Sequence, residues 1–127
     1  KISAGWSLSE EGSYPDNSIG FLNSLDLVSD YGTLTRPKLV IPLQRLMKQE
    51  EIILGEYLKV PWEMTWSCDN GEGLQCGRCS ACYNRHLSFK LAGVNDPTKY
   101  ATEPQFSVSW RETMKVGITD ILKRVLL

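Results

Sequence analysis

The sequence predicts an α/β domain that is mostly helical, contains a short strand and is held together by a four-cysteine metal site. Three observations lead to this prediction. Apolar residues recur at helical spacing in several segments, a short β-branched run precedes Pro42, and all four cysteines fall within residues 66–85. With 127 residues and 42% hydrophobic content, the chain is long enough for one globular domain, and a metal would compensate for a modest core.

The first elements are expected to be the end of a strand, a loop and a helix. Residues 1–7 begin apolar and become small and polar, which indicates a strand that runs into a loop. An apolar pattern at helical spacing then predicts a helix over about 18–30, with Gly32 as its stop. The apolar positions of this helix are Phe21, Leu22, Leu25 and Val28, and three good N-cap residues precede them: Asp16, Asn17 and Ser18.

A second strand and a second helix are predicted next. The apolar run at 38–41 predicts a buried strand, because Pro42 prevents a helix from extending into it. Residues 47–58 then show an apolar helical face, and Pro61 ends this helix. Gly55 is expected to weaken the helix by about 1 kcal/mol relative to alanine. The side expected to face solvent consists of Lys48, Gln49, Glu50, Glu51 and Lys59.

Two more helices are predicted in the remainder of the chain. Residues 79–92 are expected to be helical, with two cysteines on the first turn. Turn residues follow at 93–98, and 102–107 are polar and extended. A last amphipathic helix is expected from Trp110, mildly interrupted by Gly117. Its apolar residues are Met114, Ile118, Ile121, Leu122 and Val125.

The cysteine cluster points most directly to a chemistry. Seven residues separate Cys68 from Cys76, and two residues separate Cys76 from Cys79 and Cys79 from Cys82. Closely spaced thiolates on tight turns supply the four tetrahedral ligands of Zn²⁺, and Gly77 can adopt the positive φ that such a turn needs. Four protein ligands leave no open position for water, so the predicted zinc is structural. A redox-active or disulfide-bonded pair and an iron–sulfur cluster are the alternatives.

Composition and charge argue against several classes of function. The formal net charge of −1 disfavours a protein that mainly binds nucleic-acid phosphates. The sequence contains no run of about 18 apolar residues, so it predicts no membrane span. Thiols that bind a metal favour a cytoplasmic location. Because four cysteines complete the site, we interpret His86 as a surface or supporting residue, and Arg85 as a solvated or supporting one. The tryptophans are interpreted as core residues: Trp6, Trp62, Trp66 and Trp110.

The order and spacing of several short motifs resemble one known family. Residues 1–100 are similar to the C-terminal half of the QueC family, the 7-cyano-7-deazaguanine synthases of queuosine biosynthesis, and residues 101–127 are interpreted as a C-terminal extension with an amphipathic helix. The motifs that carry the resemblance are Tyr14-Pro15-Asp16, Ile41-Pro42-Leu43, Thr65-Trp66-Ser67-Cys68, Cys76-Gly77-Arg78-Cys79 and Asp96-Pro97-Thr98-Lys99-Tyr100.

The resemblance implies an ATP-dependent ligase that converts 7-carboxy-7-deazaguanine and ammonia to the nitrile 7-cyano-7-deazaguanine. It implies the C-terminal part of a Rossmann-like ATP pyrophosphatase fold, similar to the adenine nucleotide alpha hydrolases, in a homodimer. Tyr14 and Asp16 match a loop near the substrate site, and no residue is assigned as catalytic. The family's zinc ligands correspond to Cys68, Cys76, Cys79 and Cys82.

The glycine- and serine-rich loop that binds ATP phosphates in this family has no counterpart in the 127 residues. ATP and Mg²⁺ are therefore expected only together with an N-terminal half, to which this chain would associate. The alternative function is a noncatalytic zinc module that serves assembly or nucleic-acid contact.

Overall fold

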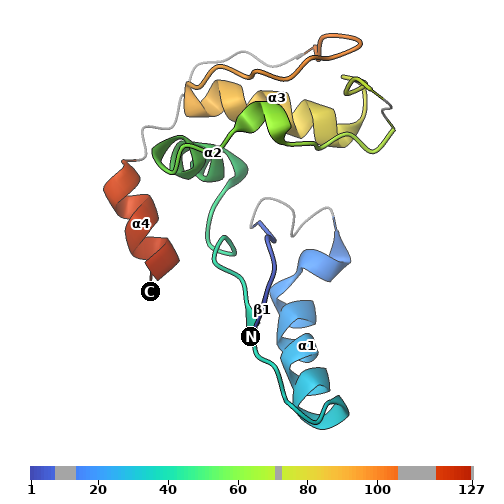
Figure 1. The fold of residues 1–127 in the computed structure, drawn as a ribbon, viewed down its shortest axis with the longest axis vertical. Helices are drawn as coiled ribbons and strands as arrows, with labels where there is room; N and C mark the ends of the chain where they lie inside the picture. Colours follow the sequence, from blue (N-terminus) through green and yellow to red (C-terminus); the bar gives the residue numbers. More distant parts are fainter. Residues whose placement is uncertain (8–13, 71–72, 106–116, 127) are drawn as a thin grey trace. The chain divides into compact units, whose positions relative to one another are not determined.

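The computed structural model describes residues 1–7, 14–70, 73–105 and 117–126. The chain forms two compact units, one from Lys1–Lys48 and Thr119–Leu127 (unit 1) and one from Gln49–Ile118 (unit 2). Figure 1 shows the elements of each. The division at residue 100 that the family resemblance implies stays a prediction. Among the described residues, no helix has both the length and the apolar character needed to cross a membrane.

Unit 1 contains a strand, a helix and a second strand that pairs with the first. These elements are β1 (Ile2–Ser3), α1 (Ile19–Gly32) and β2 (Leu39–Val40). The strands are parallel, with Ile2 opposite Leu39, and the Ile2 N–H donates to the Lys38 carbonyl at 2.9 Å. Parallel neighbours need a long crossover connection, which α1 supplies beside β1 (Figure 1). The predicted mixture of helices and short strands is confirmed.

The N-terminus of α1 is capped by Ser18, one of the three residues predicted for that role. The Phe21 N–H donates to Ser18 Oγ at 3.2 Å. The prediction that Gly32 lies just beyond the helix and stops it was wrong, because Gly32 is the last helical residue. Thr33 follows with extended backbone, and its hydroxyl donates to the Ser29 carbonyl at 2.8 Å. This side-chain bond satisfies a terminal carbonyl without a left-handed glycine.

The predicted strand at 38–41 is present as β2, but it is not buried. Val40 is 37% exposed and Leu39 is half-buried. Among the described residues the sheet has two strands, so β2 is an edge strand and not a central strand of a larger parallel sheet. The helix α1 nevertheless holds the segment in place, because Asp26 Oδ1 accepts from the Leu39 N–H at 3.1 Å.

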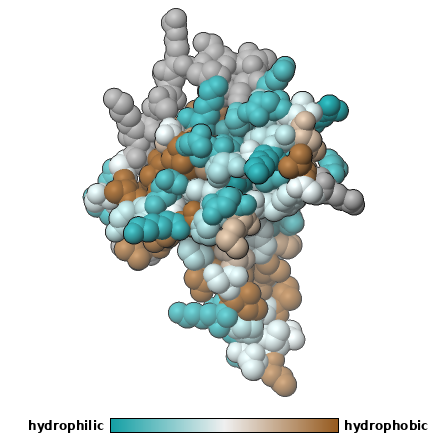
Figure 2. All heavy atoms as spheres, turned by 45° about the horizontal axis from the view of Figure 1, so that its top comes forward, coloured by the Kyte–Doolittle hydropathy of each residue, from teal (hydrophilic) through white to brown (hydrophobic). Residues whose placement is uncertain are grey.

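Much of the apolar surface of α1 faces solvent. Leu22 is its only buried residue, whereas Phe21 and Val28, two of the apolar positions that predicted the helix, are exposed. Figure 2 shows apolar side chains at the surface around this helix. The large exposed apolar residues of α1 are Ile19, Phe21, Leu27, Val28 and Tyr31.

The last helix, α4 (Ile118–Leu126), is shorter than predicted. Its expected start at Trp110, like Met114, lies outside the described residues. Gly117 precedes the helix and does not interrupt it. Ile121 is fully buried in the core, as predicted, and Arg124 Nη1 donates to the Arg45 carbonyl at 3.3 Å within unit 1.

Unit 2 contains two helices joined by the segment that carries the cysteines. The elements are α2 (Lys48–Tyr57), the 3₁₀ turn η3 (Trp62–Met64) and α3 (Ser80–Ala92). Both helices agree with the predicted ranges. The left-handed Gly93, at φ 70°, ends α3, and its N–H donates to the Lys90 carbonyl at 3.2 Å.

The predicted solvent side of α2 was wrong at two positions. Gln49 and Glu50 are buried, with 8% and 3% of their surfaces exposed. Of the predicted polar set, only Lys59 is exposed, and Lys48 and Glu51 are half-buried. Helical periodicity identifies residues that share a face, but the neighbouring segments decide which face is enclosed.

Gly55 has a packing role that helix propensity does not reveal. A Cβ at this position would lie 2.1 Å from Trp62 Cζ2 and 2.4 Å from Cη2. The Trp62 ring is itself held in place, because Nε1 donates to Glu56 at 2.6 Å and the ring meets Phe89 edge-on at 5.2 Å. The glycine therefore makes room for Trp62, and the expectation that it only weakens α2 was incomplete.

We predict that Gly55→Ala lowers the free energy of unfolding by about 1–2 kcal/mol, because the overpacking cost exceeds the gain in helix propensity. Urea unfolding of the zinc-loaded protein measures this. In a Trp62→Leu background the same substitution should be neutral or stabilising, since the ring no longer occupies the space. A more stable Gly55→Ala single variant would show that Trp62 does not constrain this site.

Candidate metal centre

The four cysteine sulfurs converge within unit 2. Their Sγ atoms all lie within 4.8 Å of one another, and the Cys76 and Cys82 sulfurs are 3.9 Å apart. Four thiolates at a Zn–S distance of about 2.3 Å would be separated by roughly 3.8 Å, the edge of the tetrahedron. All four cysteines are free thiols. The predicted cluster is therefore confirmed as a set of residues positioned to bind a metal ion.

Backbone N–H groups point at these sulfurs. Asn70 and Cys76 donate to Cys68 Sγ at 3.4 and 3.2 Å. Two N–H groups, of Arg78 and Cys79, donate to Cys76 Sγ at 3.4 Å. At the start of α3, the Cys82 N–H donates to Cys79 Sγ at 3.4 Å, so that a cysteine of the cluster also caps the helix. The two donors at Cys68 Sγ favour its thiolate form, which binds metal.

The pKa values of two of the thiols are shifted in opposite directions. The N–H of Cys76, the largest contribution, lowers the pKa of Cys68 below its usual value. Burial raises the pKa of Cys82 to about 12, so this thiol keeps its proton near neutral pH in the absence of metal. Metal binding must displace that proton, which makes affinity depend on pH.

Gly77 satisfies two requirements at once. Its φ of +72° confirms the predicted left-handed turn between Cys76 and Cys79. A Cβ at this position would also lie 1.6 Å from the carbonyl oxygen of Thr102. The segment after α3 thus passes directly against the cysteine turn, and Figure 1 shows it running back along α3 toward that turn.

Arg85 is buried and joins several segments around the cluster, so of the two interpretations the supporting role is confirmed and the solvated one is not. Its Nε donates to Thr98 Oγ1 at 2.6 Å, and Nη2 donates to the Trp62 carbonyl at 3.2 Å. The guanidinium also lies 3.8 Å from Asp96 Oδ1 and 5.1 Å from the centre of the Phe89 ring. The position of Arg85 one helical turn after Cys82 was the available sequence signal.

Asp96 is the acceptor at the centre of this network. Tyr100 donates its hydroxyl to Asp96 Oδ2 at 2.8 Å, and the Thr98 N–H donates to Oδ1 at 3.0 Å. His86 Nδ1 lies 3.2 Å from Oδ2, so this histidine supports the loop rather than the metal. Burial alone would raise the pKa of Asp96, but these hydrogen bonds outweigh burial and lower the pKa below its usual value.

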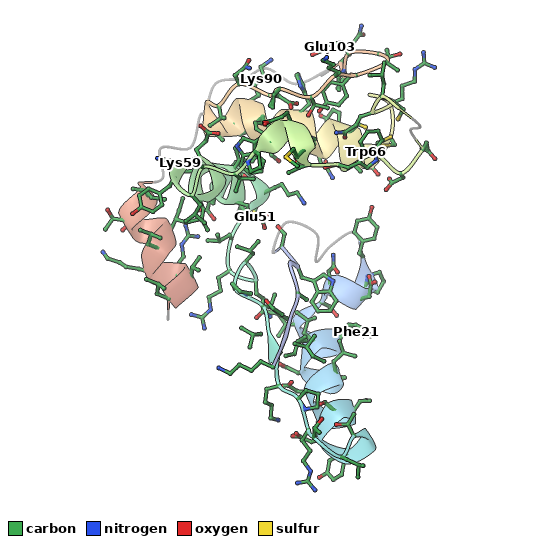
Figure 3. All side chains as sticks on the ribbon, viewed as in Figure 1. Phe21, Glu51, Lys59, Trp66, Lys90 and Glu103 are labelled. Carbon is green, nitrogen blue, oxygen red and sulfur yellow. The ribbon has the colours of Figure 1, made fainter. Side chains whose placement is uncertain are left out.

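The segment that carries Asp96 is also joined by main-chain contacts to residues 68–82, which we call the cysteine loop. Gln75 and Tyr100 form a parallel bridge, and the Ala101 N–H donates to the Gln75 carbonyl at 2.8 Å. Glu103, labelled in Figure 3 beyond this bridge, reaches within 3.6 Å of His86 Nε2. Residues 96–103 therefore connect the cysteine loop to α3.

Residues 1–93 match the family described as "Queuosine biosynthesis protein QueC". This chain belongs to the QueC family. The predicted resemblance is thereby confirmed.

Relatives in the QueC family are named 7-cyano-7-deazaguanine synthase. The protein of Methanothermobacter thermautotrophicus is 37% identical over 99 residues, which are 78% of this chain and 45% of the relative. The protein of Methanococcus maripaludis is 40% identical over 111 residues, which cover 81% of this chain and 48% of the relative. The protein of Saccharolobus solfataricus is 38% identical over 104 residues, which cover 80% of this chain and 22% of the relative. The chain thus spans about half or less of these relatives and matches their C-terminal part. No solved structure matches.

The two residues that QueC membership suggests for substrate contact lie in unit 1, away from the metal loop in the chain. Asp16 is exposed on η2 (Pro15–Asn17), and the neighbouring Tyr14 is 44% exposed. The structure brings the four cysteines together in unit 2, whereas Tyr14 and Asp16 belong to the other unit. Their role in binding substrate stays a prediction.

Proposed function

We propose that this chain is the zinc-containing C-terminal part of a 7-cyano-7-deazaguanine synthase. The reaction converts 7-carboxy-7-deazaguanine and ammonia to the nitrile, with ATP driving removal of the carboxylate and amide oxygens. The observation that carries the proposal is the match of residues 1–93 to the QueC family, with relatives of this name at 33–40% identity.

The residues that would hold zinc are Cys68, Cys76, Cys79 and Cys82. Once bound, the ion would supply folding free energy and no open coordination position for a substrate. The backbone N–H groups and the Arg85 and Asp96 network would keep the cysteine loop in the geometry that binds the ion. The metal is thus proposed to be structural.

The fold of unit 1 supports a substrate role for Tyr14 and Asp16. They follow β1 and immediately precede α1, and β1 and β2 are parallel. In open α/β sheets, ligands bind beyond the carboxyl ends of parallel strands and near helix N-termini. A β1–α1–β2 unit is also the repeating element of the Rossmann-like ATP pyrophosphatase fold that we propose for the whole enzyme.

ATP and Mg²⁺ would bind to an N-terminal half, because these 127 residues contain no glycine- and serine-rich phosphate loop. The exposed apolar residues of α1 support association with such a half or with a second copy in a homodimer. The proposed location of the enzyme is the cytoplasm, which suits metal-binding thiols.

A fusion tests the proposal. The part of the Methanococcus maripaludis synthase that this chain does not match is joined to this chain, and the fusion is supplied with 7-carboxy-7-deazaguanine, ammonia, Mg²⁺ and ATP. Mass spectrometry should detect the nitrile with the fusion, and none with this chain alone. Asp16→Asn and Tyr14→Phe should raise the KM for the acid.

The intact Methanococcus maripaludis synthase is the positive control, and the fusion must bind ATP and retain zinc. A fusion that meets both conditions yet forms no nitrile would remove the synthase proposal and favour the noncatalytic zinc module.

A further inference from the structure

A cavity of about 280 Å³ lies in unit 2 beside the cysteine loop. We refer to it as the tryptophan pocket, lined among others by Trp62, Glu63, Trp66, Leu74, Pro97 and Lys99. Its volume is just below the roughly 300–1,000 Å³ of common ligand sites. It therefore suits one small ring system and not a whole nucleotide.

Trp66 supplies a preformed aromatic wall. The residue is 52% exposed, so its interpretation as a core tryptophan was wrong. Its indole is nevertheless held, because Nε1 donates to the Cys68 carbonyl at 2.9 Å (Trp66 is labelled in Figure 3). An aromatic ring that is fixed by the metal loop and left open to solvent can stack on a planar ligand with little loss of side-chain entropy.

The second tryptophan of the pocket is fixed as well. Trp62 donates its Nε1–H to Glu56 at 2.6 Å and packs edge-on against Phe89. The polar groups of two other lining residues, Gln75 and Thr98, are also hydrogen-bonded within the protein. The Gln75 amide contacts the backbone of Ser67 and Thr65, and Thr98 Oγ1 accepts from Arg85. These residues shape the pocket but have little capacity left for a ligand.

Glu63 and Lys99 are the charged groups of the pocket. Both are exposed, and neither forms a hydrogen bond or ion pair with another residue in the described part of the chain. A carboxylate accepts hydrogen bonds from an amidine-like N–H edge, and an ammonium group pairs with an anionic substituent. The pocket therefore combines a stacking surface with one acceptor and one cation.

We propose that the tryptophan pocket binds the deazapurine ring of 7-carboxy-7-deazaguanine. The ring would stack on Trp66, its guanine-like N–H edge would donate to Glu63, and its carboxylate would pair with Lys99. This inference rests on the proposed function for the identity of the ligand. It assigns recognition of the deazapurine ring to residues of unit 2.

The experiment is a calorimetric titration of the zinc-loaded chain with 7-carboxy-7-deazaguanine and, separately, with the neutral 7-cyano-7-deazaguanine. Trp66→Ala should weaken both ligands by about tenfold to a hundredfold, the range found for loss of a base-stacking ring. Lys99→Gln should weaken only the acid, because the nitrile carries no charge for the ammonium group. Glu63→Gln should weaken both.

Two matched variants serve as controls. Trp6→Phe removes a tryptophan of unit 1, and Arg78→Gln removes an exposed positive charge of the cysteine loop outside the pocket. Both should bind as the parent chain does, and all variants must retain zinc and their melting temperature. The Lys99→Gln variant keeps the test decisive if Trp66→Ala does not fold.

Absence of binding to the parent chain, or binding that neither Trp66→Ala nor Lys99→Gln changes, would overturn the pocket assignment. If the fusion described above still forms nitrile, the pocket fails and the proposed function stands. If binding depends on Trp66 and Lys99 but a fusion that binds ATP is inactive, the pocket stands and the proposed function fails.

Discussion

Replacement of Cys79 by serine should abolish zinc binding at the four-cysteine cluster and unfold residues 66–92. Cys79 would be one of four ligands and also caps α3, accepting from the Cys82 N–H. Structural zinc contributes about 10–16 kcal/mol of apparent binding free energy in zinc-finger peptides at neutral pH, against about 5–15 kcal/mol for the whole stability of a typical domain. If the substitution abolishes metal binding, the free energy lost is therefore comparable to the whole stability of a typical domain.

Elemental analysis and circular dichroism of Cys79→Ser measure the two effects. Ser80→Ala is the neighbouring control, since Ser80 is exposed and its side chain offers no ligand to the cluster. It should keep one zinc per chain and its melting temperature. A Cys79→Ser protein with unchanged metal content and melting temperature would disprove a four-thiolate structural site.

A second large effect is expected from Gly77→Ala. The new methyl group would meet the Thr102 carbonyl oxygen at 1.6 Å, and the residue would also be strained at φ +72°. The bridge between Gln75 and Tyr100 holds the two segments together, so the backbone cannot separate without losing main-chain hydrogen bonds. We expect a loss of about 2–5 kcal/mol from strain and overpacking together, with weaker metal binding.

Gly73→Ala separates the two causes. Gly73 has a similar φ of +79°, but, its chain neighbours aside, no atom of the described residues lies within 4 Å of the position a Cβ would take. It should lose only the cost of backbone strain, about 1 kcal/mol. Chemical unfolding and competition for zinc with a chelator compare the variants. Equal losses at residues 73 and 77 would mean that the contact with Thr102 contributes nothing.

The features that the sequence predicted correctly are set by residues close to one another in the chain. The four cysteines lie within fifteen residues, from 68 to 82, and their spacing alone indicated that their sulfurs converge. The helix at 79–92 was predicted from its apolar residues and from the turn residues that follow at 93–98, and these signals act within a few residues. Tyr14 and Asp16 were predicted only through the family resemblance, because turn residues with the same local pattern are common.

The sequence by itself therefore determined the metal cluster, the two main helices of unit 2 and the family. Only the tertiary structure decided that Arg85 is buried against Thr98 and Trp62, that Gly55 makes room for Trp62 and that Gly77 faces Thr102. It also decided that Trp66 is exposed and lines a cavity. Each of these facts depends on which distant segment packs against a residue, and neither periodicity nor motif spacing contains that information.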